Sequence, residues 1–272
     1  MLKRALPLLL LLGGCAQHNL AAELDAYQLQ KVAAGYLRVD RSPEDAPISR
    51  AALAENYLKI ALNREATGGQ QSAAIPLTRW DGSIGYLTLG SGVDGATEAA
   101  IAEYLSRLEG VTGVRIRPRE ETPNGASLIV IVASEEEIPV LAGVSAYHAR
   151  RAPALDIVVD FLRNPVAGSP CYGKVLSDAE GRIRTAFVLI RSETRGLLRQ
   201  ACIEEELAQV LGLINDDPNV RPSLFNDDQE FALLTQHDEL LLRIHYDARL
   251  EPGMTLEEVR PRLGAIVRDL VP

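Results

Sequence analysis

The chain has 272 residues, a formal net charge of −9 at pH 7 and 5% aromatic residues. Such an acidic chain lacks the basic surface that binds phosphates and the interleaved aromatic residues that stack on bases. Nucleic acid is therefore not an expected partner. The length suits one substantial domain with an N-terminal extension.

The N-terminus has the parts of a secretory signal. Lys3 and Arg4 precede an apolar run over residues 5–12, too short for an ordinary membrane span, and small residues then lead to Cys15. The sequence Leu-Gly-Gly-Cys that ends at Cys15 resembles the bacterial lipobox. The resemblance implies that residues 1–14 are removed as a signal peptide and that Cys15 carries a lipid. An ordinary signal peptide is the alternative.

The residues after Cys15 set the expected location. Ala16 and Gln17 follow the cysteine, so aspartate is absent from the position that resembles an inner-membrane retention signal. We therefore expect an outer-membrane lipoprotein that faces the periplasm. By composition, residues 15–47 are a lipid-anchored N-terminal segment and linker, and residues 48–272 are the folded domain.

Hydrophobic periodicity predicts mixed helices and strands over the first half of the chain. The expected elements are helices over 21–37 and 49–63, a loop at 68–72, extended segments over 75–80 and 84–89, a helix over 96–108, and strands over 114–117 and 127–132. Ser49 is the expected N-cap of the second helix, and Asp81 and Gly82 the expected tight turn between the two extended segments. The continuous apolar run over 127–132 indicates a strand that is covered on both faces.

The second half is predicted to contain one hairpin and several helices. The expected elements are a helix around 138–147, a possible strand around 157–161, a hairpin of 171–176 with 183–190, and helices over 194–213, 235–246 and 255–270. Thr255 and Glu258 resemble a capping box. Cys171 and Cys202 are the other cysteines, and in an oxidising compartment they favour one disulfide. Two buried free thiols and a paired-cysteine metal site are the alternatives.

The predicted helix over 194–213 carries the most informative pattern. Ile203 and Leu207 lie on an apolar stripe, whereas Glu205 and Gln209 stand one turn apart on another face. Gly212 can end the helix in a left-handed conformation, which would bring residue 215 or 216 back towards that pair.

This spacing resembles the long zinc-protease signature His-Glu-x-x-His-x-x-Gly-x-x-His. Glu205, Gln209 and Asn215 occupy the three histidine positions, Glu206 the general-base position and Gly212 the glycine position. The order strand, helix, two strands, hairpin and long helix is also similar to the zincin scaffold. The resemblance implies an α+β fold in which a metzincin-like twisted mixed sheet covers a long active-site-type helix, with C-terminal helices after it.

The downstream sequence extends the resemblance. Residues 217–238 resemble the tail of a matrixin-type metzincin, in which Phe225 takes the place of the turn methionine and Ser223, like Asp216, lies at the cleft or turn. From residue 49 onwards the chain also resembles an uncharacterised domain family of Gram-negative bacterial lipoproteins that is grouped with the metallopeptidase fold. The residues that carry this resemblance are Cys-Ile-Glu-Glu-Glu-Leu-x-Gln at 202–209, Leu-Gly-Leu-x-Asn-Asp at 211–216, Leu-Phe-Asn-Asp at 224–227, His-Asp-x-Leu-Leu-Leu-Arg at 237–243 and Arg-Leu-x-Pro-Gly-Met at 249–254.

The donor set at the three ligand positions disfavours zinc. Catalytic zinc takes three good protein ligands, usually imidazoles, whereas one carboxylate and two amides stand here. Without a metal, Glu206 has no activated water to deprotonate. His237 and His245 are expected to be structural, Glu204 to be solvated near the helix start, and Ser223 to lack a histidine partner.

Three interpretations of the site stay open. Glutamate and glutamine could form a hydrogen-bond network that braces the helix against the sheet where zinc once did so. The cleft could instead be retained for binding a peptide or a polymer end. Thirdly, oxygen-bearing side chains suited to calcium gather in the sequence at Asn215, Asp216, Asp217, Asn226, Asp227 and Asp228.

We therefore predict an envelope lipoprotein with an inactive metallopeptidase-like domain and no cofactor. Its expected partners are the membrane, through the lipid on Cys15, and a protein or peptide bound as an extended chain by strand addition. One alternative is a hydrolase with a non-histidine metal site that uses Glu206 as general base. Another is a purely structural envelope protein.

Overall fold

The computed structural model describes residues 19–64, 73–123, 125–152, 155–164, 169–226 and 228–271. The fold is α+β, as predicted. The helices are α1 (Leu20–Ala33), α2 (Arg50–Leu62), α3 (Gly95–Thr112), α4 (Glu137–Ala149), α5 (Asp156–Arg163), α6 (Gly196–Gln209), α7 (Gln236–His245) and α8 (Leu256–Leu270). The strands are β1 (Asn63–Arg64), β2 (Ala73–Ala74), β3 (Arg79–Trp80), β4 (Ile84–Leu89), β5 (Ile116–Pro118), β6 (Ala126–Ala133), β7 (Cys171–Ser177) and β8 (Arg182–Arg191). Within the described ranges, no helix is long and apolar enough to cross a membrane.

The main sheet is mostly parallel. Strands β5, β4, β6 and β8 lie in that order, and each neighbouring pair is parallel. β8 also pairs with the short parallel strand β3, at Arg182 and Ile183, and with the longer antiparallel strand β7, which is the hairpin partner predicted from the sequence. Among the described residues, β7 pairs only with β8, so it ends the sheet on that side.

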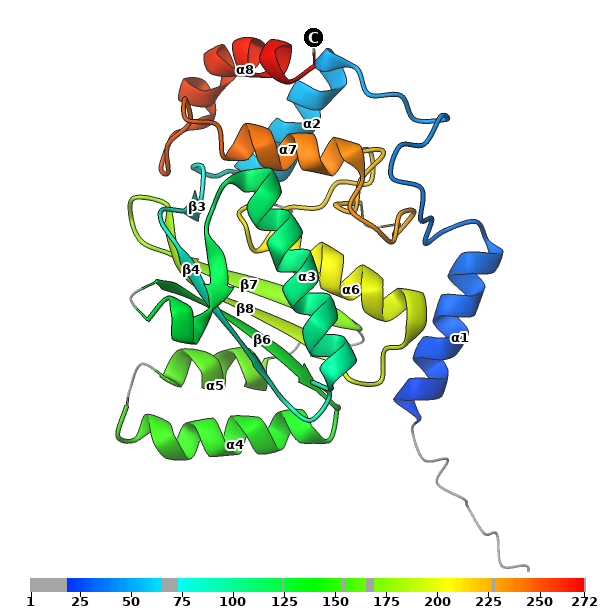
Figure 1. The fold of residues 1–272 in the computed structure, drawn as a ribbon, viewed down its shortest axis with the longest axis vertical. Coiled ribbons are helices and arrows are strands. Elements are labelled where there is room, and N and C mark those ends of the chain that lie inside the picture. Colours follow the sequence, from blue (N-terminus) through cyan, green and yellow to red (C-terminus); the bar gives the residue numbers. More distant parts are fainter. Residues whose placement is uncertain are drawn as a thin grey trace, which may run out of the picture.

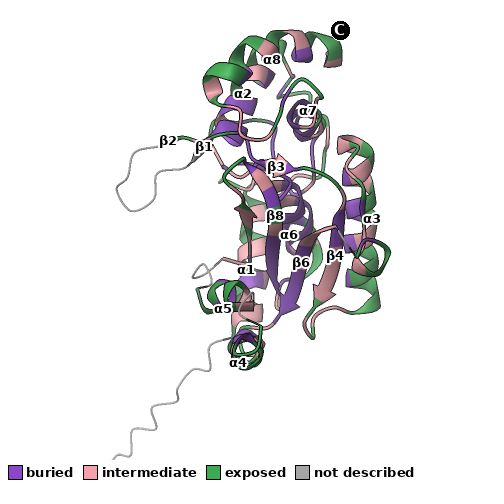
Figure 2. Ribbon diagram, turned by 90° about the vertical axis from the view of Figure 1, so that its left-hand side faces the viewer, coloured by how far each residue is buried: buried purple, intermediate pink, exposed green. Residues whose placement is uncertain are grey.

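Helices cover both faces of this sheet (Figure 1). α3 and α6 lie on one face, where their apolar residues form a core with Val130 and Val132 of β6. α4 and α5 lie on the other face, where Ile131 packs with Ile138 and Phe161. Successive side chains of a strand point to opposite faces, so the uninterrupted apolar run of β6 serves both cores. The buried residues accordingly run along β6, β8 and α6 (Figure 2).

A second group of helices packs at one end of the sheet. α2, α7 and α8 lie together beyond the end of α3, away from α4 and α5 (Figure 1). The Ser49 side chain caps α2 by accepting a hydrogen bond from the Ala52 amide at 3.1 Å. Thr255 and Glu258 form the predicted capping box of α8.

Three predicted elements differ from those observed. The possible strand at 157–161 is helix α5, because Val158, Phe161 and Leu162 recur at helical spacing and pack beneath the sheet. The two segments around Gly82 form no hairpin: β3 pairs with β8, whereas β4 pairs with β5 and β6. The residues before β3 contact the loop before α8 instead, since the Leu77 amide donates to Met254 O at 2.8 Å.

The helix expected to reach residue 213 ends at Gln209. The expected loop at 68–72 and the lipobox with Cys15 lie outside the described residues.

The N-terminal segment lies against the domain. In α1, the Gln28 side chain accepts a hydrogen bond from the Leu198 amide at the start of α6. Further on, the Arg38 amide donates to Glu230 O at 2.7 Å, and Leu37 is buried. Arg41 reaches Glu204 of α6. The segment expected to be a linker therefore covers part of α6 and of the loop before α7.

The predicted disulfide between Cys171 and Cys202 is confirmed. It links the first residue of β7 to the middle of α6 across 31 residues of chain. Both cysteines are buried in the core between helix and sheet. The disulfide therefore fixes α6 to the terminal strand of the sheet.

We expect the double variant Cys171→Ser/Cys202→Ser to lose about 3–4 kcal/mol of unfolding free energy, because the unfolded chain regains the entropy of a 31-residue loop. Urea unfolding measures this loss. A reductant should lower the midpoint of the native protein and leave that of the double variant unchanged. Equal midpoints for the two oxidised proteins would contradict the prediction.

Candidate functional site

The candidate site is built on α6, which follows β8 directly. Arg199 stabilises the connection, since its guanidinium donates to Ser192 O and Thr194 O at 2.8 Å each. Ile203 and Leu207 are buried against the sheet, as the apolar stripe predicts. The polar face of α6 points away from this core and carries Glu205 and Gln209.

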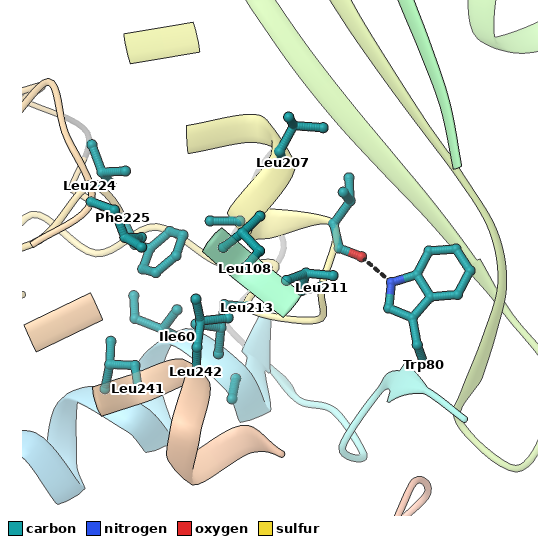
Figure 3. Packing of buried hydrophobic residues seen from close by; sticks show 14 of the residues in the cluster. Ile60, Trp80, Leu108, Leu207, Leu211, Leu213, Leu224, Phe225, Leu241 and Leu242 are labelled. Atoms are coloured by element: carbon teal, nitrogen blue, oxygen red, sulfur yellow. Dashed lines mark hydrogen bonds between the residues drawn. The ribbon is translucent and has the colours of Figure 1, made fainter. Parts of the chain in front are cut away.

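The end of α6 is fixed by side chains from other elements. The Trp80 indole donates to Val210 O at 2.8 Å (Figure 3). Gly212 has a φ of +117°, and a Cβ added there would lie 2.2 Å from Thr78 O and 2.3 Å from His245 Nε2. Glycine is required at this turn both by its backbone conformation and by the close approach of these two groups.

The two buried histidines near the site have structural roles. His245 Nε2 donates to Thr78 O at 3.1 Å, and Tyr57 Oη donates to His245 Nδ1 at 3.2 Å. Burial lowers the pKa of His245 to about 3, so the ring is neutral and both nitrogens are engaged. His237 accepts a hydrogen bond from Asn56 Nδ2 at its Nε2.

The turn at Gly212 returns Asp216 to the polar face of α6. Gln209 Nε2 donates to the two carboxylate oxygens of Asp216 at 2.8 and 3.0 Å. Asn215, by contrast, donates from its side chain to Lys59 O and from its amide to Ile60 O. These carbonyls belong to the last turn of α2, where a helix leaves its acceptors unsatisfied. The expected convergence of Asn215 with Glu205 and Gln209 is therefore not found, and Asp216 takes that place.

Glu206 lies on the sheet side of α6, one turn beyond Cys202. It is 5% exposed, and its Oε2 has no hydrogen-bond partner. A Cβ added at Gly173 of β7 would lie 3.0 Å from this oxygen, so the carboxyl group fills the space that a side chain would take. Burial raises the pKa of Glu206 well above its usual value, and the carboxylates of Glu205 and Asp216 add to the effect. Burial therefore favours the protonated form of Glu206.

The other two glutamates of the run face different surroundings. Glu204 was expected to be solvated, but this is wrong: it is 4% exposed. Its carboxylate accepts hydrogen bonds from the Leu234 amide at 2.7 Å and from the Arg41 guanidinium. Glu205 is half-buried on the side of α1, where its charge adds to the effect of burial in raising the pKa of Tyr27.

Ser223 and Phe225 stabilise the loop before α7. Ser223 Oγ donates to Asp238 Oδ1 at 2.6 Å, and the Leu224 amide donates to Asp238 Oδ2. Asp238 also completes a capping box with Thr235 at the start of α7. Phe225 is fully buried beneath the end of α6 (Figure 3). The sequence pattern Thr-x-x-Asp at 235–238 could have identified this capping box.

The oxygen-rich residues Asp217 and Asn226, considered for calcium, make hydrogen bonds within the loop between α6 and α7. Asn226 Nδ2 donates to Pro218 O and Val220 O, and Asn219 contacts the Asp217 carboxylate. In the part of the chain that the structure describes, no three His, Cys, Asp or Glu side chains are grouped to hold a metal ion. Asp227 lies outside that part.

A family model described as "Protein of unknown function (DUF2927)" matches residues 50–265. The chain belongs to this family. The match begins with α2 and ends within α8, so the DUF2927 domain contains the whole site, whereas α1 lies outside it. Neither the curated proteins nor the solved structures contain a significant match. The sequence-based assignment to an uncharacterised domain family is thereby confirmed.

In the DUF2927 domain, we expect Glu206→Gln to remove a pH-dependent loss of stability. Burial raises the pKa of Glu206 in the folded state, whereas the unfolded chain releases this proton above the ordinary pKa of 4.5. The stability of the native protein should therefore fall relative to the variant as pH rises above that value, by at most about 1.4 kcal/mol per pH unit.

Urea unfolding of both proteins between acidic and mildly alkaline pH measures this difference. Glu257→Gln, at an exposed position in α8, is the control and should leave the pH profile unchanged. A difference between Glu206→Gln and the native protein that does not vary with pH would show that Glu206 is ionised in the fold.

Proposed function

We propose that this protein is an envelope lipoprotein whose DUF2927 domain has a zincin-like scaffold and binds an extended peptide without hydrolysing it. The scaffold is supported by the order of elements: strand β4, helix α3, strands β5 and β6, then, after α4 and α5, the β7–β8 hairpin and α6. The glycine turn after α6 and the return of Asp216 to Gln209 add further support.

The side chains at the ligand positions do not fit a zincin-type zinc site. Such a site takes three protein ligands and keeps an open position for water. Gln209 directs its amide nitrogen at Asp216, and Asn215 directs its amide at Lys59 O. Glu206, in the base position, is enclosed against Gly173, and burial raises its pKa well above the usual value. The proposed function therefore contains no metal-dependent step.

The observation that carries the proposal is the outer edge of β7. The Arg191 amide donates to Pro170 O at 2.9 Å, directly opposite in the β7–β8 register. In an antiparallel pair, hydrogen-bonded and non-hydrogen-bonded positions alternate, so Tyr172 and Lys174 bond to β8. Gly173 and Val175 then point their backbone N–H and C=O groups away from the sheet. These groups can pair with an added strand.

The outer strand β7 lies beside the part of α6 that carries Glu206. Gly173 has no side chain, and Glu206 fills the space beneath it. A peptide paired with Gly173 and Val175 would be recognised mainly through its backbone, so extended conformation would matter more than sequence. The disulfide at Cys171 keeps this edge in a fixed position relative to α6.

Two features of β7 favour a second candidate function, that of a purely structural envelope protein that binds no peptide. Lys174 is exposed on β7, and the β7–β8 register shifts between Leu176 and Ser177. An exposed lysine and a bulge are features by which proteins protect an edge strand from pairing with other chains. The two candidates differ in whether β7 contacts a partner in the cell envelope.

We expect a photoreactive amino acid at Lys174 to crosslink to a protein partner in intact envelopes. Adding Val175→Pro should abolish the crosslink, because proline removes an outward N–H and leaves the β7–β8 ladder in place. Val175→Ala is the matched control and should retain the crosslink. Thermal unfolding checks that all variants fold.

Two outcomes would contradict strand addition. One is an equal crosslink from a photoreactive group at Glu257 on α8. The other is a crosslink at Lys174 that Val175→Pro does not change. The absence of any crosslinked product would favour the structural role.

A further inference from the structure

Helix α4 presents an apolar face to solvent. Val140, Val144 and Tyr147 are 62%, 52% and 54% exposed, and their spacing places them on one side of the helix. The opposite side carries Ile138 and Ala142, which pack beneath the sheet. A helix that is apolar on both sides usually has a partner for each.

Other exposed apolar residues lie near this face. Ile157 lies on the neighbouring helix α5, and Leu89 pairs with Ile131, whose side chain packs against α4. Of the large hydrophobic residues exposed in the described ranges, most lie on this side of the sheet: Leu89, Val140, Val144, Tyr147 and Ile157, against Leu29, Val32 and Val39 elsewhere. Figure 2 shows α4 and α5 as the outer layer at one end of the molecule.

The C-terminal end of this face is basic, although the chain as a whole is acidic. No acidic residue occurs over 138–155, whereas His148, Arg150 and Arg151 follow the apolar face and are exposed. The Arg150 guanidinium lies over the Tyr147 ring, 5.5 Å from its centroid. The acidic residues near this face are Glu135, Glu136 and Glu137 at the other end of α4, and Asp156 and Asp160 on α5. Apolar and aromatic side chains flanked by arginines suit the interface of an anionic bilayer.

The N-terminal end of the described chain lies at the start of α4. Asn19, Leu20 and Ala21 line a cavity together with Glu135 and Glu136. Cys15 is four residues before Asn19, a separation that spans at most about 14 Å even when fully extended. A lipid on Cys15 would therefore hold the bilayer within one helix length of α4, which is itself about 20 Å long.

We propose that α4 lies on the bilayer, with Val140, Val144 and Tyr147 among the lipid headgroups and Arg150 and Arg151 near anionic phosphates. This inference rests on the proposed lipid anchor at Cys15. The anchor holds the protein at the membrane, and α4 orients it. α2, α7 and α8, at the opposite end of the molecule, then point away from the membrane (Figure 1).

The test places a tryptophan on α4 of the full-length protein isolated from membranes. Val144→Trp and the control Glu257→Trp are reconstituted into vesicles of phosphatidylethanolamine and phosphatidylglycerol that carry brominated acyl chains. The native Trp80 is buried and gives the same background in both. We expect the tryptophan at position 144 to shift to the blue and to lose most of its fluorescence, and the tryptophan at position 257 to change little.

Charge provides a second measurement on the same protein. Adding Arg150→Glu and Arg151→Glu to Val144→Trp should reduce the quenching, as should vesicles without phosphatidylglycerol. Equal quenching of Val144→Trp and Glu257→Trp would overturn the proposal. So would a tryptophan at position 144 that becomes shielded in native envelopes and stays unquenched in vesicles, since this identifies a protein partner.

Mass spectrometry of the N-terminal peptide separates the anchor from the α4 contact. An acylated Cys15 together with an unquenched tryptophan at position 144 overturns the α4 contact and leaves the anchor. Quenching in a protein whose Cys15 carries no lipid supports the α4 contact and overturns the anchor.

Discussion

The close packing of Gly212 against Thr78 and His245 is the constraint on which the site depends. A side chain at residue 212 would overlap the Thr78 carbonyl and the His245 ring, so the turn can form only with glycine. His245 is neutral because it is buried, and it holds Thr78 through its Nε2. The turn fixed in this way carries Asp216 back to Gln209 and leaves Asn215 with the end of α2. Gln209, Asp216 and Asn215 are thereby paired within the protein.

A second constraint is that the residue spacing along β7 matches the length of one turn of α6. Two residues along a strand cover about 6.6 Å and four residues along a helix about 6 Å, so contacts can repeat in step along both elements. Cys171 bonds to Cys202, and two residues on, Gly173 meets Glu206, one helical turn further along α6. The buried acid thus lies next to β7, which pairs with no strand other than β8 among the described residues. The disulfide and the Gly173–Glu206 contact therefore fix α6 and β7 relative to each other.

Sequence patterns identify those features that depend on the types and spacing of a few residues. The hairpin, the disulfide, the caps of α2 and α8 and the turn at Gly212 follow from alternation, cysteine pairing, capping residues and glycine. The burial of Glu204 could not be predicted, because its partner Arg41 lies 163 residues away in the chain. Asn215 could not be distinguished from Asp216, because the carbonyls of α2 that bind Asn215 are set by the tertiary structure. Helix α5 could have been recognised, since its apolar residues recur at helical spacing.

The central claim is that Gln209 and Asp216 form an internal polar pair at the end of α6, without a metal. A double-mutant cycle tests it most directly: urea unfolding of the native protein, Gln209→Ala, Asp216→Ala and the double variant, in chelator and again with zinc. The predicted coupling energy is about 1–2 kcal/mol, as for a partly buried hydrogen bond to a carboxylate, and it is the same with and without zinc. Additive effects of the two substitutions, or a coupling that zinc removes while stabilising the native protein, would contradict the claim.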